Sequence, residues 1–469
     1  MLTQISGSLL LVLLSGCAFV NQKTGFDDVS AAVEERSAMK IFWNKGTELD
    51  KQAAEKLQSL LQGELTADAA VQVALLNNRD LQAMYAELGV AQADLVQAGL
   101  LKNPVFDAIV KFPVSGGRPN LELDAVMSFL DVFYIPLKKR VAAARLEEVK
   151  IRVTGVVLDF AAQVRRAFYL YQANAQMLEL RQTIVQALGA SLEAARRLYD
   201  AGNITDLDLA RERALAEAAK LQLRSAEMTS SQSREQLNVL MGLWGNETEW
   251  QPGERLPEIP TQPLQFGDIE RVALTRSVDL SASRQRIVVA GEQLGLSKAI
   301  GLIPDFGLGV HGERNEGSWE AGPVLAFSIP LFDQGQGRTG RSAAELRRSQ
   351  QEYYALGVRV RSTARATRDR LRGSQDRSLY YRDILLPLHE RIVAETQLHY
   401  NAMQLGVFQL IRAREQQIET AAAYVEALRD YWLARVDLDQ LLTGRLPSSN
   451  ESPLRLRGGQ IISDVSEGQ

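Results

Sequence analysis

The sequence has little cysteine, proline and histidine, and it has no long apolar run. Its 469 residues include 1 Cys, 14 Pro and 3 His. One cysteine excludes an intramolecular disulfide. The absence of an apolar stretch of about 18 residues excludes a transmembrane helix in the mature protein, so a membrane-spanning form would have to use strands. The net charge of −4, with Lys and Arg spread along the chain, leaves no basic patch for nucleic acid.

The residue patterns of common enzyme chemistry are also missing. The histidines are His311, His389 and His399, and the mature chain has no cysteine besides Cys17 that could complete a zinc site. The methionines form no cluster, and neither a GxxxxGK[ST] phosphate loop nor a nucleophile motif occurs. We therefore predict a protein that is not an enzyme and that has no cofactor and no bound metal.

The N-terminus resembles a bacterial lipoprotein signal. Residues 1–16 contain a short apolar run, Leu9 to Leu14, and Ser15-Gly16 then precede Cys17. This pattern predicts that residues 1–16 are removed and that Cys17 is lipidated and becomes the first mature residue. Ala18 follows the cysteine, and the absence of Asp there implies sorting to the outer membrane. The alternative is a buried free thiol.

A β-hairpin is predicted within residues 104–130. Apolar and polar residues alternate from Asn120 to Leu130, and the preceding run alternates in the same way before a turn rich in proline and glycine. Glu122 and Asp124 share one face, whereas the other face is apolar. Strands of about ten residues with one apolar and one charged face suit a wall between lipid and water. A hairpin half-buried on a soluble domain would show the same alternation.

A second hairpin is predicted within residues 304–329. Pro323 lies inside its last strand and predicts a bulge or an edge position, because proline cannot donate a ladder hydrogen bond. In the two hairpins together, the side chains expected to face lipid are those of Leu121, Leu123, Met127, Phe129, Phe306, Leu308 and Phe327.

Long helices surround the hairpins. No proline occurs between Pro136 and Pro252, and apolar residues there are spaced by three and four positions. The spacing predicts a helix from about 138 to 200, roughly 90 Å long. Gly202 ends this helix, and a second helix over 206–243 returns antiparallel to it.

The plan of helix, strand pair and helical hairpin occurs twice. Tyr199-Asp200-Ala201 recurs as Tyr400-Asn401-Ala402, about 200 residues later. The predicted parts are a signal peptide (1–16), a partly extended N-terminal lead-in (17–65), a first repeat (66–243), a Pro-rich linker (244–267), a second repeat (268–445) and a disordered tail (446–469). Four strands cannot close a barrel, and an open sheet edge in lipid leaves backbone groups unpaired. Three copies would supply twelve strands.

These features resemble the outer-membrane efflux protein family, the TolC-like exit ducts of Gram-negative bacteria, in its lipoprotein form. The resemblance covers roughly residues 66–445 and the lipid-attachment motif. It is carried by the duplicated plan, by the segment Ile329 to Arg338 (IPLFDQGQGR) after the fourth strand, and by the two Tyr-x-Ala turns.

The resemblance implies a mixed α and β membrane protein. It implies four transmembrane strands per chain in a homotrimeric twelve-stranded β-barrel, and long antiparallel coiled-coil hairpins that form a periplasmic tunnel. It also implies the outer-membrane channel of a tripartite efflux system, which passively conducts solutes to the exterior. The implied partners are outer-membrane lipid, a periplasmic adaptor (membrane fusion protein) and an inner-membrane pump.

The resemblance also implies roles for residues at the two helical turns. The adaptor would contact Arg197, Leu198, Gly202, Tyr400 and Met403, the last of which stands where the family usually has glycine. The pore entrance would be lined by Asp206, Asp208, Gln409 and Arg412, the last two being taken as the second-half counterparts of the aspartates. Three copies of a carboxylate would form an anionic ring. The alternative role of the aspartates is capping of a helix N-terminus.

Two other functions use the same sequence features. A periplasmic coiled-coil scaffold lipoprotein would need only enough apolar strand surface to pack once. An exit duct of a type I protein secretion system would share the whole fold.

Overall fold

The structure, a computed structural model, describes residues 25–46, 48–112, 114, 116, 119–253, 255–260, 267–302, 306–315 and 318–447. Cys17, the predicted signal peptide and nearly all of the predicted tail lie outside these residues. The chain forms two compact units, to which Met1–Ala31, Met84–Val153 and Val278–Gly357 (unit 1) and Ala32–Ala83, Thr154–Ser277 and Val358–Gln469 (unit 2) are assigned. In the described parts of both units, no helix has the length and apolar character needed to cross a membrane.

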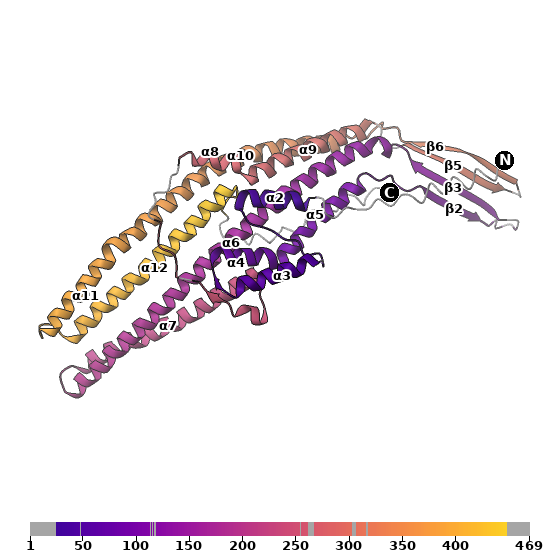
Figure 1. Ribbon diagram of the computed structural model, residues 1–469. Coiled ribbons are helices and arrows are strands. Elements are labelled where there is room, and N and C mark those ends of the chain that lie inside the picture. Colours follow the sequence, from indigo (N-terminus) through magenta and orange to yellow (C-terminus); the bar gives the residue numbers. More distant parts are fainter. Residues whose placement is uncertain are drawn as a thin grey trace. The chain divides into compact units, whose positions relative to one another are not determined.

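Unit 1 contains a four-stranded antiparallel sheet (Figure 1). Its strands are β2 (Val105–Lys111), β3 (Asn120–Ser128), β5 (Phe306–Asn315) and β6 (Ser318–Phe327), in the order β2-β3-β5-β6. The two predicted hairpins are therefore joined through β3 and β5. The prediction of an edge position for Pro323 is confirmed, since β6 is an outer strand, and its pairing with β5 continues through Pro323 without a bulge.

Helices of unit 1 pack beside one another next to the sheet. They are most of α5 (Arg79–Gln97), α9 (Val278–Leu302), and the first parts of α6 (Asp131–Asp200) and α10 (Gln336–Tyr380). Ser297 of α9 and Ser342 of α10 share a buried hydrogen bond of 3.0 Å between their hydroxyl oxygens. Tyr85 of α5 is fully buried, and its ring meets the edge of Phe26 at the start of α2 (Phe26–Ser37).

Helix α6 begins earlier than predicted. Its 70 residues start at Asp131 rather than near residue 138, and they include Pro136. A proline close to the start of a helix removes one hydrogen bond without ending the helix. At 1.5 Å per residue, α6 is about 105 Å long.

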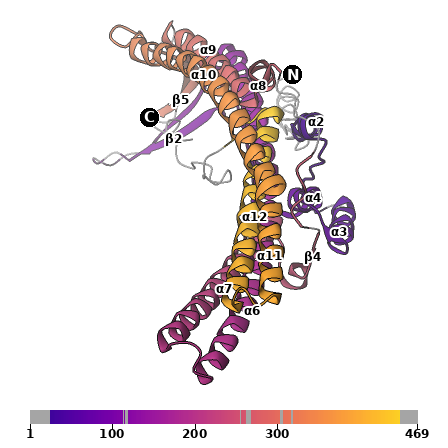
Figure 2. The same cartoon turned by 90° about the vertical axis from the view of Figure 1, so that its left-hand side faces the viewer.

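Unit 2 is helical and contains two long helical hairpins, α6 with α7 and α11 with α12 (Figure 2). The hairpin helices are α7 (Asp206–Met241), α11 (Leu386–Asn401) and α12 (Val407–Thr443), together with the second part of α6. The unit also contains α3 (Glu48–Leu61), α4 (Ala67–Asn77), α8 (Ile269–Arg276) and the π-helical segment η2 (Tyr381–Leu385). The turns of the two hairpins lie at the same end of the unit (Figure 2).

The helical stretch before the first strand is interrupted at Asn78, between α4 and α5. This residue is extended (φ −64°, ψ 123°), and Ser277 between α8 and α9 has nearly the same conformation (φ −60°, ψ 114°). The Asn78 side chain stabilises the break through two hydrogen bonds. Its Oδ1 accepts from Leu81 N in the first turn of α5 at 3.0 Å, and its Nδ2 donates to Leu240 O of α7 at 3.1 Å. The break is therefore a repeated feature of the two halves.

The described part of the lead-in is more helical than predicted, and the Pro-rich linker contacts the lead-in and the neighbouring helices. The lead-in contains α2 and α3 and ends in β1 (Glu64–Leu65), which pairs in parallel with β4 (Gln251–Pro252) of the linker. Linker residue Trp250 is 2% exposed, and its indole Nε1 donates to Asn238 Oδ1 at 2.7 Å. Burial of apolar side chains from the linker and from residues 32–65 of the lead-in stabilises these segments within unit 2.

Candidate functional sites

The sheet has one apolar face. The cross-strand register places Leu123 between Ala108 and Gly312, and Leu308 between Met127 and Leu325. By the same register, Leu121, Phe306 and Phe327 share this face, and most of its large side chains are exposed in the single chain. Phe129 has the same parity but lies just after β3, where its ring packs on Phe133.

The opposite face of the sheet is charged. One cross-strand row joins Asp107, Asp124 and His311, and the next row joins Glu122, Glu313 and Glu320. His311 Nδ1 lies 2.7 Å from Asp124 Oδ1, and Lys111 pairs with Glu122. The sheet thus separates an apolar side from an ionic side, as a wall between lipid and water requires.

The two outer strands of the sheet have open edges. Within the described part of the chain, β2 pairs only with β3 and β6 pairs only with β5. Each open edge presents backbone N–H and C=O groups without strand partners. In lipid such groups cost several kcal/mol each, so this sheet requires strands from another chain if it lies in a membrane.

The first helical turn, between α6 and α7, is closed by backbone hydrogen bonds. Gly202 N donates to Tyr199 O at 2.8 Å, and Asn203 N donates to Leu198 O at 2.8 Å. This helix-ending pattern needs a left-handed residue, which glycine adopts without steric cost. Gly202 has φ +74° and takes that position.

The second helical turn, between α11 and α12, repeats this geometry with a different residue. Met403 N donates to Tyr400 O at 2.9 Å, and Gln404 N donates to His399 O at 3.0 Å. Met403 takes the left-handed position with φ +59°. The side chain of Met403 is 94% exposed.

The helices that follow the turns share one capping hydrogen bond. Thr205 precedes α7 and Gly406 precedes α12, and the backbone N–H of each donates to the side chain of the third helical residue. Only Thr205 also accepts through its own side chain, from Asp208 N. Asp208 therefore corresponds to Gln409, and the predicted match of Asp208 with Arg412 is wrong. The spacing from each cap matches Asp206 with Val407 and Arg412 with Arg211.

The pore-entrance candidates have different surroundings. Asp208 Oδ2 accepts from Thr205 Oγ1 at 2.7 Å and from Thr205 N at 3.3 Å, so Asp208 is a capping residue. Gln409 Oε1 accepts from Gly406 N at 2.8 Å in the same role. Asp206, the first residue of α7, and Arg412 are both exposed.

The cap at the first turn is expected to weaken in acid, whereas the cap at the second turn is not. Hydrogen bonds from Thr205 lower the pKa of Asp208 below its usual 3.8. A carboxylate with a lowered pKa stabilises the fold at neutral pH, and this contribution is lost as the pH falls through its folded-state pKa. We predict that amide exchange in the first turn of α7, relative to intrinsic rates, accelerates below about pH 4.

The first turn of α12 is the internal control for this experiment, because Gln409 does not titrate. The variant Asp208→Asn should remove the pH dependence from α7. Equal acid sensitivity at both turns would show that the Asp208 cap is not its cause.

A group of carboxylates near the turns was missed in the sequence. Ser191 Oγ donates to Glu212 Oε2 at 2.7 Å, and Glu212 is buried. Arg181 Nη1 of α6 lies 2.6 Å from Glu419 Oε1 of α12. Burial raises the pKa of Glu415, and the neighbouring charges of Glu419 and Glu212 raise it further. No sequence signal distinguishes these residues from an ordinary solvated helix face.

These carboxylates adjoin an apolar cluster that joins the hairpins. Its buried members come from α6, α7 and α12 and are Ile184, Leu188, Leu192, Ala216, Ala219 and Ile418. Arg412 partly offsets the effect of the other carboxylates on the pKa of Glu415. The positive charge of Arg412 therefore acts on a carboxylate of the same chain, that of Glu415.

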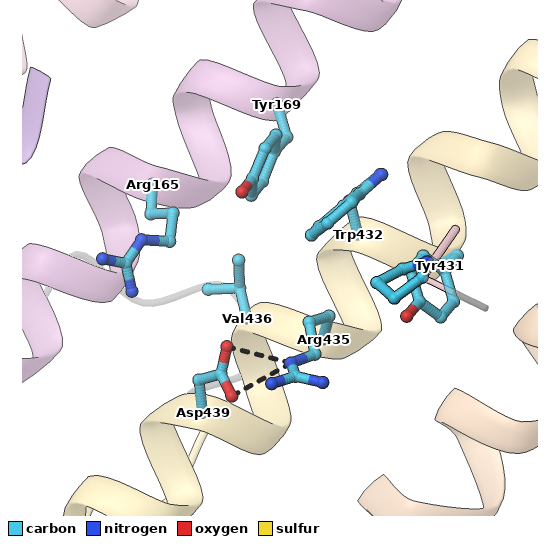
Figure 3. Close-up of a pocket in the computed structure, with 8 residues that line it drawn as sticks. Arg165, Tyr169, Tyr431, Trp432, Arg435, Val436 and Asp439 are labelled. Atoms are coloured by element: carbon cyan, nitrogen blue, oxygen red, sulfur yellow. Dashed lines mark hydrogen bonds and ion pairs between the residues drawn. The ribbon is translucent and has the colours of Figure 1, made fainter. Parts of the chain in front are cut away.

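Figure 3 shows a small cavity between α6 and α12. Its volume is about 180 Å³, below the ~300–1,000 Å³ of typical ligand pockets. The ring centroids of Tyr169 and Trp432 lie 5.0 Å apart, and Arg435 Nε pairs with Asp439 Oδ1 at 3.1 Å. Four of the lining side chains thus interact in pairs with one another. Among the described residues, no group of three or more His, Cys, Asp or Glu side chains is arranged to hold a metal ion.

The chain is similar to known proteins in sequence and in fold. No family model matches the chain. It is 24% identical over 390 residues to the cobalt-zinc-cadmium resistance protein CzcC of Cupriavidus metallidurans, covering 81% of this chain and 90% of that protein. It is also 24% identical over 423 residues to the pyoverdine export outer membrane protein OpmQ of Pseudomonas putida, with 78% and 86% covered.

The fold matches a solved structure of an outer-membrane channel. The CmeC channel of Campylobacter jejuni superposes with a TM-score of 0.63 at 13% identity, covering 87% of this chain and 92% of that one. The two-faced sheet and the paired helical hairpins thus define an outer-membrane channel fold. In sequence and in fold, the chain thus resembles the outer-membrane efflux proteins of the TolC-like family.

Proposed function

We propose that this protein is the outer-membrane channel of a tripartite efflux system and passively conducts solutes from a pump complex to the exterior. The observation that carries this proposal is the sheet with an apolar face, a charged face and two open edges. Three copies would pair β2 of one chain with β6 of the next and close twelve strands around a water-filled lumen. The helical hairpins would extend into the periplasm.

The apolar and ionic faces then have separate roles. Leu121, Leu123, Met127, Phe306, Leu308 and Phe327 would contact the outer membrane, and Phe129 would lie at its boundary. The charged rows would line the lumen, while a lipid on Cys17 would add an anchor. Asp206, exposed at the start of α7, would contribute a carboxylate to the pore entrance, beside the capping residues Asp208 and Gln409 and the exposed Arg412.

The proposed partners would bind at the helical turns. A periplasmic adaptor would contact Arg197, Leu198 and Gly202 at the first turn and Tyr400 and Met403 at the second, and an inner-membrane pump would supply the energy. The relatives' names give different cargoes, cobalt, zinc and cadmium for one and pyoverdine for the other. We infer that the pump, not this chain, chooses the cargo, and we assign this chain no catalytic step.

Single-channel conductance in planar bilayers tests this function. Full-length protein is extracted in detergent, its oligomeric mass is measured, and it is added to the bilayer. We expect conductance steps from a species of three protomers. A nonconducting protomer that stays soluble after removal of the lipid anchor would overturn the proposal.

A further inference from the structure

The two helical turns have the same backbone but different surfaces. The matching hydrogen bonds show that Arg197 and Leu398 are equivalent positions in the two halves, and that Gly202 and Met403 are equivalent as well. At the first turn, Arg197 Nε pairs with Glu193 Oε1 at 3.1 Å, and Gly202 has no side chain. At the second turn, both positions carry exposed apolar side chains, Leu398 and Met403, whereas an exposed tyrosine (Tyr199 or Tyr400) is common to both turns.

The backbone of Met403 has a left-handed conformation (φ +59°), which is unfavourable for residues other than glycine. Left-handed φ values bring the Cβ of an L-residue close to the following carbonyl, and glycine avoids this contact. The turn is held by other groups, since His399 Nδ1 lies 2.5 Å from Gln404 Oε1 and Gln397 Nε2 donates to Asn401 Oδ1 at 3.0 Å. The Met403 side chain, 94% exposed, has little packing against its own chain that would offset the strain. Its side chain therefore contributes little to the fold of this turn.

We propose that Met403, with Leu398, is the specificity-determining apolar anchor of the second turn and inserts into an apolar hollow at the tip of the periplasmic adaptor. This inference rests on the proposed function, because it deepens the contact between channel and adaptor. The second turn fits an apolar hollow rather than a charged one, because it exposes two flexible apolar side chains. At the equivalent positions, the first turn has the Arg197 ion pair and Gly202, which has no side chain. Methionine suits such a contact because its unbranched side chain adapts to irregular hollows.

The first step of the test identifies the adaptor surface. The photo-crosslinker p-benzoylphenylalanine is placed at position 403, and separately at position 199 of the first turn, in the full-length protein in its own outer membrane. Crosslinked peptides are identified by mass spectrometry. We expect position 403 to capture an apolar segment at the turn of a helical hairpin in a periplasmic protein.

The second step measures how tightly that purified protein binds four variants of the trimer. Met403→Gly relieves the strained turn, so it should keep or raise the melting temperature while weakening binding about tenfold or more. Met403→Gln keeps the length and strain but adds a polar amide, and it should weaken binding similarly. Met403→Leu should bind within about threefold of the wild type. Gly202→Met, the matched change at the first turn, should not strengthen binding.

The outcomes separate this inference from the proposed function. If the crosslinker at position 199 captures the adaptor but Met403→Gly binds as tightly as the wild type, the anchor is wrong and the channel function stands. If neither position captures a periplasmic protein, adaptor docking at these turns is wrong, and so is the anchor. Weaker binding together with a lower melting temperature in Met403→Gly would also contradict the inference, because it would assign Met403 to the fold.

Discussion

Replacing Leu123 with arginine is expected to abolish most membrane-inserted trimer. Leu123 lies in the middle of β3, between Ala108 of β2 and Gly312 of β5, on the apolar face of the sheet. A cation at the bilayer midplane on the lipid side of a barrel costs about 2–4 kcal/mol. Three symmetry-related copies would each carry this cost. The measurement is the yield of heat-resistant trimer in outer-membrane fractions.

Glu313→Arg is the matched control for this prediction. Glu313 lies in the neighbouring strand β5 on the charged face, between Glu122 and Glu320. An arginine there would face two carboxylates in water, so trimer yield should be close to that of the wild type. If Leu123→Arg and Glu313→Arg gave the same trimer yield, the apolar face would not contact lipid.

Replacing Arg445 with methionine should destabilise the helical core of unit 2 by about 3–5 kcal/mol, because it leaves a buried carboxylate without its cation. Asp159 of α6 is 8% exposed, and Arg445 Nε lies 3.0 Å from its carboxylate. Gln440 Nε2 donates to the same carboxylate at 2.8 Å. Gly155 makes room for the guanidinium, since a Cβ there would lie 2.9 Å from Arg445 Nη1.

Hydrogen exchange measures this loss where it occurs. Amides of α6 near Asp159 and of the last turns of α12 should exchange about a hundredfold to several thousandfold faster in Arg445→Met. Arg435→Met is the matched control, because Arg435 pairs with Asp439 one turn away in a half-exposed position, where such pairs contribute about 0.3–0.5 kcal/mol. The double variant Asp159→Leu/Arg445→Met should recover most of the stability. Equal effects of Arg445→Met and Arg435→Met would contradict the role of the buried pair.

Several features could be predicted from the sequence because their patterns are local. Alternation with a period of two identified both hairpins and the residues of their apolar faces, and the register of the sheet agrees with that pattern. The long stretches without proline identified the long helices, and Pro323 marked the edge strand. These patterns depend on residues within a few positions of one another, so they need no knowledge of distant contacts.

Other features were decided only by tertiary structure. The order β2-β3-β5-β6 depends on pairing between strands almost two hundred residues apart, and the Asp159–Arg445 pair joins residues still further apart. The match of Asp208 with Gln409 follows from the capping hydrogen bonds and not from the residue types. Burial of Glu212 depends on which helix packs against α7, which helical periodicity does not specify. The sequence therefore determined the elements and their faces, whereas long-range packing determined which faces meet and which charges are buried.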